Sequence, residues 1–463
     1  MYRKNELVEL EITSVTNLGY GVGKNGDNPV VFVPGAVTGE KIRATIIKVC
    51  SGYCIGRLAK ILSGTALRDN NQLCTAPASC GGCPYRFLVY DEELRIKREN
   101  VAAEFRKAGI ADAEIMPVKY VADESGRPVI YNYRNKAQYR FYNTQNGISA
   151  GFYASGTHRI TGNIDCPLQP AVFAEIAKFI CEYASAAGIS VFDESTGKGI
   201  LRHLYIRSSA SRSDICVCLV INAGLPGWSS DIADKIMSGF PNVSGVVFNI
   251  NLKKSNVILG DRYIVVKGRD GISDIFCGKR FDVRMAAFYQ VNHDAAELLC
   301  ATAKKLLDDS REHTDNQVFL DLYCGIGTIG LSVADCNQRL IGVEIVPEAV
   351  ECANKNAKIN SVANCEFICA DSFEGAQKYL DLLSANDIVC VDPPRKGCSA
   401  ELLEAINKSK SGTLLYISCN PATLARDCAV MKNSGWTLSQ IYPVNLFPRT
   451  GHVETVCLLT KNK

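Results

Sequence analysis

The chain lacks the features that would assign it to a membrane, secreted or repetitive class. Its 463 residues contain no apolar run close to the ~18 residues that a membrane-spanning helix needs. The opening Met-Tyr-Arg-Lys-Asn-Glu holds no apolar signal region, and the chain shows no internal repeat and no low-complexity segment. We therefore expect a globular protein in the cytoplasm, without a membrane partner.

An excess of either charge is also missing. The formal net charge is +3, which is too small to identify a polyanion partner by itself. Residues 1–60 hold eight Lys or Arg residues against five Asp or Glu residues, so the rest of the chain sums to zero. A small basic module on a neutral body fits docking to nucleic acid, and it fits a solvated barrel surface equally well.

Cysteine, by contrast, is abundant, with 21 residues. In a small secreted domain this number would indicate disulfides, but the chain is long and opens without a signal region. We expect a reducing compartment, in which cysteines are free, ligate a metal or act in catalysis.

Three regions of the chain differ in pattern. Residues 6–61 predict five short strands with glycine turns such as Gly19–Gly23, which is typical of an oligonucleotide-binding barrel. This stretch resembles a TRAM domain, an RNA-binding barrel found in RNA-modifying enzymes. The region from about residue 117 to 285 mixes strands and helices without a parallel repeat, which predicts an α+β domain.

From about residue 286, strands and helices alternate regularly, which predicts a doubly wound parallel sheet. The fold class is therefore α/β, with a Rossmann-like domain that follows the all-β barrel and the α+β domain. The expected strands cover 317–322, 339–343, 364–369, 387–391, 412–417 and 454–459. The expected helices cover 90–108, 293–308, 328–335, 347–360, 373–383, 400–408 and 421–434. The expected domains are residues 1–62, 63–285 and 286–463.

A glycine-rich turn follows the first strand of this alternation. Gly325, Gly327 and Gly330 let the backbone approach a ligand at the start of the next helix. The same spacing matches the dinucleotide fingerprint, so an NAD-dependent oxidoreductase with a redox cluster is an alternative.

Acidic residues at four strand ends favour S-adenosylmethionine (SAM) as the cofactor. Asp321 precedes the glycines, where a carboxylate can hold the cofactor's ammonium group. Glu344 ends the second strand and can accept both ribose hydroxyls. Asp371 ends the third strand near the adenine, and Asp392 ends the fourth strand over the reacting centre.

Cys419 lies at the end of a predicted strand, before a helix that begins at Pro421. We expect the amino terminus of that helix to lower the pKa of the thiol. A thiolate that adds to C6 of uracil makes C5 nucleophilic enough to take a methyl group, and a base must then remove the C5 proton. Glu454 is a candidate for that base, and His452 is its rival.

Four motifs together resemble the RNA uracil-C5 methyltransferase family. They are Asp-Pro-Pro-Arg-Lys-Gly, Ser-Cys-Asn-Pro, Gly-His-Val-Glu-Thr-Val and Phe-Tyr-Gln-Val-Asn, and they begin at positions 392, 418, 451 and 288. The resemblance implies that Cys419 is the nucleophile, that Glu454 accepts the proton and that Phe288 packs near the target base. It also implies that SAM contacts Gln290, Tyr323, Glu344, Asp371 and Asp392.

A cysteine-rich loop predicts a metal centre. Cys74, Cys80 and Cys83 lie in one loop, and Cys166, which precedes a proline, is the best candidate for a fourth ligand. Four thiolates can hold an iron–sulfur cluster or zinc, and the spacing does not choose between them. The arrangement resembles the ribosomal-RNA branch of the family, which implies a [4Fe–4S] cluster and 23S rRNA as the substrate.

Basic and aromatic residues interleave in two further segments, 131–142 and 201–207. We interpret them as an RNA-binding face that includes Arg134, with strands that have one solvated face as the alternative. The sequence thus predicts a SAM-dependent RNA (uracil-5-)-methyltransferase that acts on 23S rRNA as a monomer and does not bind DNA. A transfer-RNA uracil-C5 methyltransferase is the alternative within the family.

Overall fold

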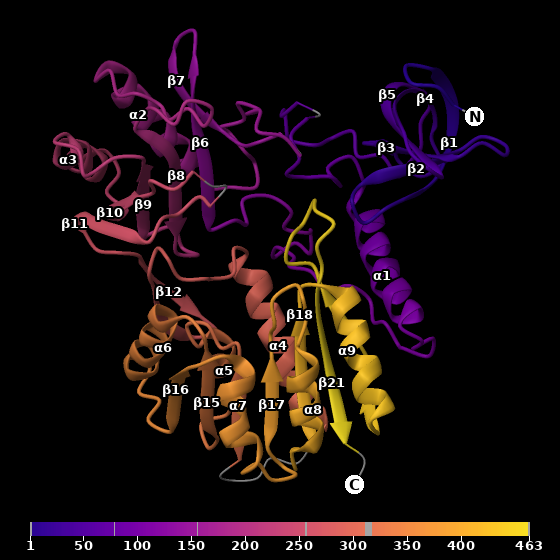
Figure 1. Ribbon diagram of the computed structural model, residues 1–463, viewed down its shortest axis with the longest axis vertical. Helices are drawn as coiled ribbons and strands as arrows, with labels where there is room; N and C mark the ends of the chain where they lie inside the picture. Colours follow the sequence, from indigo (N-terminus) through magenta and orange to yellow (C-terminus); the bar gives the residue numbers. More distant parts are fainter. Residues whose placement is uncertain (1, 78, 155, 255–256, 311–316, 462–463) are drawn as a thin grey trace.

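The computed structural model describes residues 2–77, 79–154, 156–254, 257–310 and 317–461. It contains a small barrel, a central antiparallel-rich sheet and a larger C-terminal α/β unit (Figure 1). Residues from all three parts line one cavity. The predicted α/β fold class, with a barrel at the N-terminal side, is confirmed.

The barrel is closed, with strand order β1-β2-β3-β5-β4. Its strands are β1 (Leu7–Val15), β2 (Tyr20–Lys24), β3 (Val30–Pro34), β4 (Lys41–Val49) and β5 (Tyr53–Ser63). The segment predicted as a glycine turn is largely strand β2. Its glycines are buried, and a Cβ on Gly21 would meet Ala36 at 2.8 Å. Gly21 and Gly23 are required because the barrel interior is crowded, whereas Gly19, with a φ of 76°, does lie in the turn before β2.

The central sheet has the strand order β11-β10-β9-β8-β6-β7. Its strands are β6 (Lys136–Thr144), β7 (Gly147–Gly151), β8 (Leu201–Ser208), β9 (Ile215–Ile221), β10 (Val243–Ile250) and β11 (Arg262–Gly268). Two helices complete this unit, α2 (Ala171–Ala186) and α3 (Ser229–Gly239). A separate hairpin, β12 (Ile272–Phe276) and β13 (Lys279–Val283), leads into the C-terminal unit. Among the described strands of this sheet, β9 and β10 are the only pair that runs in parallel, so the unit is α+β.

The C-terminal sheet has the order β16-β15-β14-β17-β18-β21-β19, and β20 also pairs with β21. Its strands are β14 (Val318–Leu322), β15 (Arg339–Glu344), β16 (Cys365–Cys369), β17 (Ile388–Val391), β18 (Thr413–Ser418), β19 (Trp436–Leu438), β20 (Tyr442–Val444) and β21 (Glu454–Lys461). Its helices are α4 (His293–Ser310), α5 (Thr328–Val333), α6 (Pro347–Ile359), α7 (Ser372–Leu380), α8 (Ala400–Lys408) and α9 (Pro421–Asn433). The short strands β19 and β20 have no counterpart among the predicted elements.

Helices cover both faces of this sheet. Phe319 of β14 points into a core formed with α4, α5 and α6, whereas Leu320 and Leu322 point into the opposite core with α7, α8 and α9. Helix α1 (Tyr90–Lys107) joins the second core through Val101 and Phe105 and lies beside α9 (Figure 1). A helix from the N-terminal third of the chain is therefore part of the C-terminal unit.

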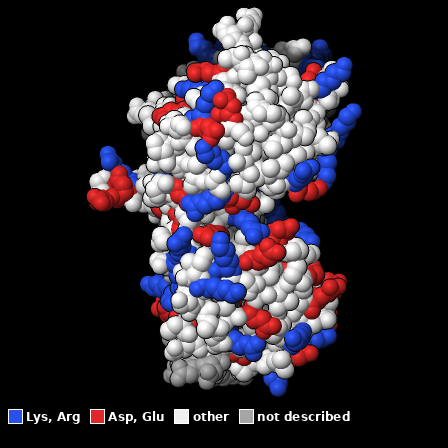
Figure 2. All heavy atoms as spheres, turned by 90° about the vertical axis from the view of Figure 1, so that its left-hand side faces the viewer, with Lys and Arg blue, Asp and Glu red and all other residues white. Residues whose placement is uncertain are grey.

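The strand order of the parallel sheet changes direction between β14 and β17. The strands β15 and β16 are added on one side of β14, and β17 and β18 are added on the other side. A crevice forms at the carboxyl ends of strands at such a switch point, and ligands bind there in open α/β sheets. On the face shown in Figure 2, basic and acidic side chains are interspersed over both the central and the C-terminal unit. Within the part of the chain that the structure describes, no helix is long and apolar enough to cross a membrane.

Candidate active site

One cavity of about 1760 Å³ opens where the barrel, the cysteine-rich loop and the C-terminal unit meet. The barrel contributes Leu18 and Arg57, the segment after it contributes Arg68, and the cysteine-rich loop contributes Cys80 and Cys83. The cavity wall also includes residues that the sequence singled out: Arg134, Phe288, Gln290, Tyr323, Gly325, Glu344, Asp371, Asp392, Cys419, His452 and Glu454. Residues from all three parts of the molecule thus surround a single space.

The glycine turn after β14 is tied to the end of β15. Tyr323 has a φ of 69°, a left-handed conformation that costs energy for a residue with a side chain. Its backbone N–H donates to the Val343 carbonyl at 2.9 Å, and the Gly325 N–H donates to Glu344 Oε2 at 3.1 Å. A Cβ on Gly325 would meet nothing within 4 Å, so the turn borders open space. The strained backbone holds the Tyr323 ring on the cavity wall.

Asp321 does not have the role expected of it. The carboxylate is fully buried, does not line the cavity, and accepts a hydrogen bond from the Gly330 N–H at 2.9 Å. Burial raises the pKa of Asp321 to about 8. A Cβ on Gly330 would lie 2.7 Å from Asp321 Oδ2. Asp321 therefore fixes the glycine turn through a hydrogen bond on the side away from the cavity. The expectation that it meets the cofactor's ammonium group is wrong.

Three other strand-end carboxylates reach the cavity. Glu344 accepts from the Val346 N–H at 2.9 Å, and Asp371 caps α7 by accepting from the Phe373 N–H at 2.9 Å. Burial raises the pKa of Asp392 to about 7. Carboxylates around an open glycine turn fit a cofactor that carries ribose hydroxyls, an ammonium group and a cationic sulfur. The residues present therefore fit SAM.

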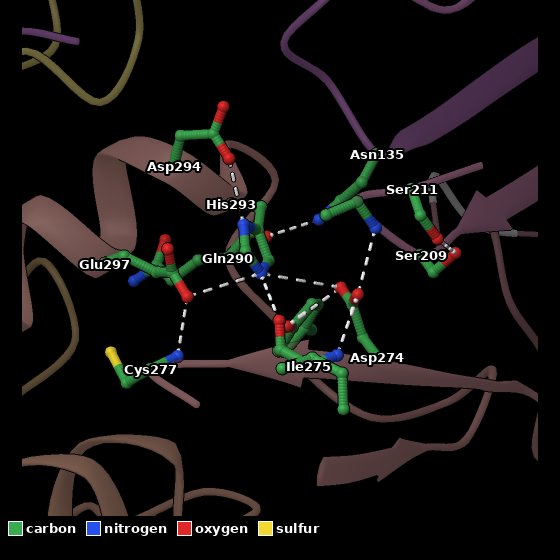
Figure 3. Close-up of polar contacts among 12 residues, drawn as sticks. Asn135, Ser209, Ser211, Asp274, Ile275, Cys277, Gln290, His293, Asp294 and Glu297 are labelled. Carbon is green, nitrogen blue, oxygen red and sulfur yellow. Dashed lines mark hydrogen bonds and ion pairs between the residues drawn. The ribbon is translucent and has the colours of Figure 1, made fainter. Parts of the chain in front are cut away.

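The segment that carries Phe288 and Gln290 is fixed by hydrogen bonds from two side chains of the central unit. Asn135 Nδ2 donates to the Gln290 carbonyl at 2.8 Å (Figure 3), and the buried Arg207 donates to the Ala287 carbonyl at 2.7 Å. The Phe288 side chain is 70% exposed although the residues around it are fixed. An aromatic ring presented in this way is available to stack on a base.

His293 begins α4 directly after this segment and lies among three carboxylates (Figure 3). Its Nδ1 is 3.0 Å from Asp294, and its Nε2 is 2.7 Å from the Ile275 carbonyl. Burial lowers the pKa of His293, but Asp294, the Ile275 carbonyl, Asp274 and Glu297 together raise it to about 9. The imidazolium thus links the β12–β13 hairpin to the start of α4.

Cys419 and Glu454 face each other because of strand pairing. Strands β18 and β21 are antiparallel with Ser418 opposite Thr455, and the Thr455 hydroxyl donates to the Ser418 carbonyl at 3.0 Å. Cys419 follows Ser418 and Glu454 precedes Thr455, so the two residues lie at the same end of this pair. Both line the cavity, and the Glu454 carboxylate acts on the pKa of the thiol. The thiol and the carboxylate therefore meet at the carboxyl end of the sheet.

The electrostatic environment of the thiol differs from the expectation. Burial and then the carboxylates of Glu454 and Asp392 raise the pKa of Cys419 to about 11, and the Arg395 guanidinium opposes them. Asn420 caps α9 by accepting from the Ala422 N–H at 3.2 Å, as the helix start predicts. The predicted lowering of the thiol pKa is wrong for the RNA-free protein, because burial and two facing carboxylates outweigh the helix terminus.

Both candidate bases line the cavity. Glu454 is 3% exposed, and burial followed by Asp392 raises its pKa to about 8. His452 is more exposed, and its Nε2 lies 3.3 Å from Arg395 Nη2. Burial and nearby cations, Arg395 first among them, lower the pKa of His452. Of the two, Glu454 is the one in register with the thiol.

The four cysteines of the predicted metal centre gather along a second cavity, of about 720 Å³, which Cys74, Cys80, Cys83 and Cys166 all line. Burial and then the other three thiols raise the pKa of Cys83 to about 12. Within the described residues, no three His, Cys, Asp or Glu side chains are grouped so as to hold a single metal ion.

The predicted RNA-binding face is largely wrong. Segment 201–207 is the central strand β8 and is buried throughout. Arg202 donates to the carbonyls of Asn251 and Lys253, at 2.7 and 2.9 Å. In segment 131–142, Arg140 is likewise buried and donates to two backbone carbonyls. The guanidinium groups of these two arginines are thus bonded to backbone carbonyls of the protein. Arg202 lines the same cavity as Arg134 and Lys136.

Comparisons with known proteins agree with this geometry. The family model described as tRNA (Uracil-5-)-methyltransferase matches residues 276–462. An uncharacterized RNA methyltransferase of Clostridium acetobutylicum is 36% identical over 459 residues, which are 99% of this chain and 98% of that protein. Another, from Halalkalibacterium halodurans, is 34% identical over 460 residues, with 98% and 97% covered.

Among solved structures, the fold is similar to the Pyrococcus abyssi tRNA (uracil-54, C5)-methyltransferase in complex with S-adenosyl-L-homocysteine. The TM-score is 0.75 at 25% identity, and the match covers 98% of this chain and 100% of that one. The fold and site thus define a SAM-dependent methyltransferase. The chain belongs to the RNA uracil-5-methyltransferase family, and the alternative of an NAD-dependent oxidoreductase is wrong.

Proposed function

We propose that the protein methylates C5 of a specific uridine through a covalent adduct with Cys419. The observation that carries this proposal is the opposition of Cys419 and Glu454 across the β18–β21 pair, in the cavity that the strand-end carboxylates also line. A nucleophile and a base within one enclosed space are what substitution at an unreactive ring carbon requires.

The proposed reaction conserves atoms and electrons. The Cys419 sulfur bonds to C6 of the uracil, and the electrons of the C5–C6 double bond move toward C5 and the C4 carbonyl. SAM supplies an electrophilic methyl group when it is bound. C5 would gain that methyl group as the bond between the methyl carbon and the cofactor sulfur breaks, and the electrons of that bond would stay on the sulfur, which leaves as the neutral thioether S-adenosylhomocysteine. The Glu454 carboxylate then removes the C5 proton. The electrons of that C–H bond restore the double bond, and the thiolate leaves.

The raised pKa values set the protonation states in this proposal. Glu454, with a pKa of about 8, and Asp392, with a pKa of about 7, exchange protons near neutral pH. A thiol with a pKa of about 11 must lose its proton as it attacks. We assign that proton to the Asp392 carboxylate, so that Glu454 stays ionised to accept the C5 proton later. Arg395 stabilises the negative charge because it lowers the pKa of both Cys419 and Glu454.

The remaining contacts follow from the cavity wall. We propose that Gln290, Tyr323, Glu344, Asp371 and Asp392 bind SAM. Phe288, as an exposed ring on a fixed segment, would stack on the target uracil, and Arg134 would hold the RNA backbone. A uridine inside a helix would have to leave the stack to reach Cys419.

We further propose a [4Fe–4S] cluster on Cys74, Cys80, Cys83 and Cys166. Support comes from the gathering of these thiols along one cavity and from their mutual effect on the pKa of Cys83. A four-iron cluster separates its cysteine ligands more widely than one ion does, so it needs no single-ion geometry. Iron and sulfide analysis after anaerobic purification tests the proposal; zinc without iron would contradict it.

The proposed substrate is 23S rRNA, and the protein is proposed to act as a cytoplasmic monomer divided at about residues 62 and 285. The barrel and the cysteine loop, which both border the cavity, support ribosomal RNA by their resemblance to that branch of the family. The P. abyssi structure is that of a tRNA enzyme, which keeps tRNA as the second candidate.

Mapping of 5-methyluridine in ribosomal and transfer RNA, with and without this protein, decides between the substrates. Loss of the modification from 23S rRNA supports the proposal, and loss from tRNA alone contradicts it. In vitro, Cys419→Ala is expected to abolish turnover and adduct formation. Glu454→Gln is expected to accumulate the adduct, and normal turnover by that variant would refute the assignment of the base.

A further inference from the structure

The second cavity, beside the catalytic one, contains more than the cysteines. It shares Cys80, Cys83, Arg86 and Arg134 with the catalytic cavity, so the two form a continuous surface. Beyond the cysteine loop, it extends over the β6 side of the central sheet. A strand of RNA with its target base near Cys419 can therefore continue into this space.

Arg134 and Lys136 are cations on the wall of this cavity for which the described residues supply no ion-pair partner. The Lys136 Nζ lies 5.7 Å from the centre of the Tyr205 ring. Burial, and then the neighbouring Arg207 and Arg134, lower the pKa of Lys136 to about 8. A partly buried lysine beside two arginines is costly unless an anion binds there.

The proposed cluster accounts for only one of these cations. Arg134 lowers the pKa of Cys83 and Cys166, so it lies close enough to the thiolates to balance their charge. The charged groups that act on Lys136 are both arginines. A cluster on the cysteines therefore leaves Lys136 without a counter-ion.

The rest of the wall suits a nucleotide base. Tyr131 and Phe152 contribute aromatic rings, and Gln138 contributes an amide that can both donate and accept hydrogen bonds. The Tyr131 hydroxyl accepts from the Leu73 N–H at 3.3 Å, which ties this ring to the cysteine-rich loop. Rings next to cations are the usual means of holding an unpaired nucleotide.

We propose that this cavity binds a second nucleotide of the RNA substrate, a neighbour of the methylated uridine, with its phosphate on Lys136 and its base against Tyr131 or Phe152. The inference rests on the proposed RNA methylation and extends it to a site that selects the sequence or shape beside the target. In this proposal, the cysteine-rich loop, which lines both cavities, lies between the two bound nucleotides.

The test compares Lys136→Gln with Lys235→Gln. Lys235 lies on α3 and its side chain is 53% exposed, so the control removes the same charge from the same unit outside both cavities. Dissociation constants are measured for a substrate-derived single-stranded RNA over a series of salt concentrations. Lys136→Gln is expected to weaken binding roughly tenfold and to reduce the slope of log K against log salt by about 0.7. Lys235→Gln should leave both unchanged, and Lys136→Arg should restore binding.

A second measurement identifies the phosphate. Each phosphate of the RNA is replaced in turn by an uncharged methylphosphonate. Replacement of one phosphate next to the target uridine should weaken the binding of RNA to the wild type, but it should not change the binding of RNA to Lys136→Gln. If every position affects both proteins equally, or if Lys136→Gln binds like the wild type with an unchanged salt slope, the inference is wrong. Methylation of the RNA by the wild type in the same samples shows separately whether the proposed function stands.

Discussion

A buried ion pair on α1 should be essential for the loop that carries the candidate bases. Lys97 and Glu93 have side chains that are 0% exposed, and Lys97 Nζ donates to Glu93 Oε1 at 2.9 Å. The same ammonium group donates to Asn445 Oδ1 at 2.6 Å and to the Phe447 carbonyl at 3.1 Å. Helix α1 thus holds the loop that leads to Glu454.

Glu93 also contacts this loop directly. Its carboxylate accepts from the Arg449 N–H at 3.0 Å and from Asn445 Nδ2 at 3.0 Å. Arg449 has a φ of 70°, so its backbone needs such support. In Lys97→Met, the carboxylate stays buried and loses its counter-charge, although it keeps these donors. Removal of one partner from a buried pair costs about 3–5 kcal/mol, and we expect the lower end of that range.

Urea unfolding tests this prediction through the shift of the midpoint multiplied by the m-value. Lys107→Met is the matched control, because Lys107 is on the same helix in an ion pair with Glu104 but its side chain is 70% exposed. The control should lose less than about 1 kcal/mol. The double variant Glu93→Gln/Lys97→Met should lose less than Lys97→Met alone, since no charge remains buried. A loss in Lys97→Met no larger than in Lys107→Met would refute the reasoning.

Three further predictions follow from the site. Because the pKa of Glu454 is raised to about 8, kcat/KM for tritium release from 5-³H-uridine RNA should rise with pH around that value; a flat profile from about pH 6 to 9 would contradict it. His293, with a folded pKa of about 9 against about 6.5 when unfolded, stabilises the fold fully below pH 6.5 and less as the pH rises through 9. His293→Gln should therefore be destabilised by up to ~3 kcal/mol at pH 6, a deficit that shrinks above pH 9, and a constant deficit in urea unfolding would count against this. Gly330→Ala should weaken SAM binding in calorimetry and cost about 1–3 kcal/mol of stability, because its Cβ would lie 2.7 Å from Asp321 Oδ2. Gly239→Ala, where a Cβ meets nothing within 4 Å, should bind SAM like the wild type.

The C-terminal fold was predictable because its strands are buried on both faces. Such strands appear as short apolar runs, and the acids at their carboxyl ends mark the crevice. Glu344, Asp371 and Asp392 do line the cavity. Asp321 does not, because the position of an acid on a strand does not reveal whether its side chain turns toward the ligand or toward the neighbouring helix.

Features that depend on long-range pairing were not predictable. Burial and then the Glu454 carboxylate raise the pKa of Cys419, and nothing local to the thiol indicates the β18–β21 pairing that brings Glu454 to this end of the sheet. Arg202 and Arg207 were interpreted as RNA contacts because their charges suggested an exposed strand. In the structure they donate to carbonyls of distant loops, which only the central place of β8 in its sheet makes possible. The burial of Lys97 depends likewise on long-range contacts, with Asn445 and Phe447 of a distant loop.

The most direct test of covalent catalysis is a mass-spectrometric search for a protein–RNA conjugate. RNA that carries 5-fluorouridine at the target position cannot release a proton from C5, so the adduct should persist once the methyl group is transferred. With SAM, we predict a denaturation-resistant conjugate in which the RNA is attached to the peptide that contains Cys419, and none in Cys419→Ala. No conjugate, or one attached to a different residue, would contradict the account.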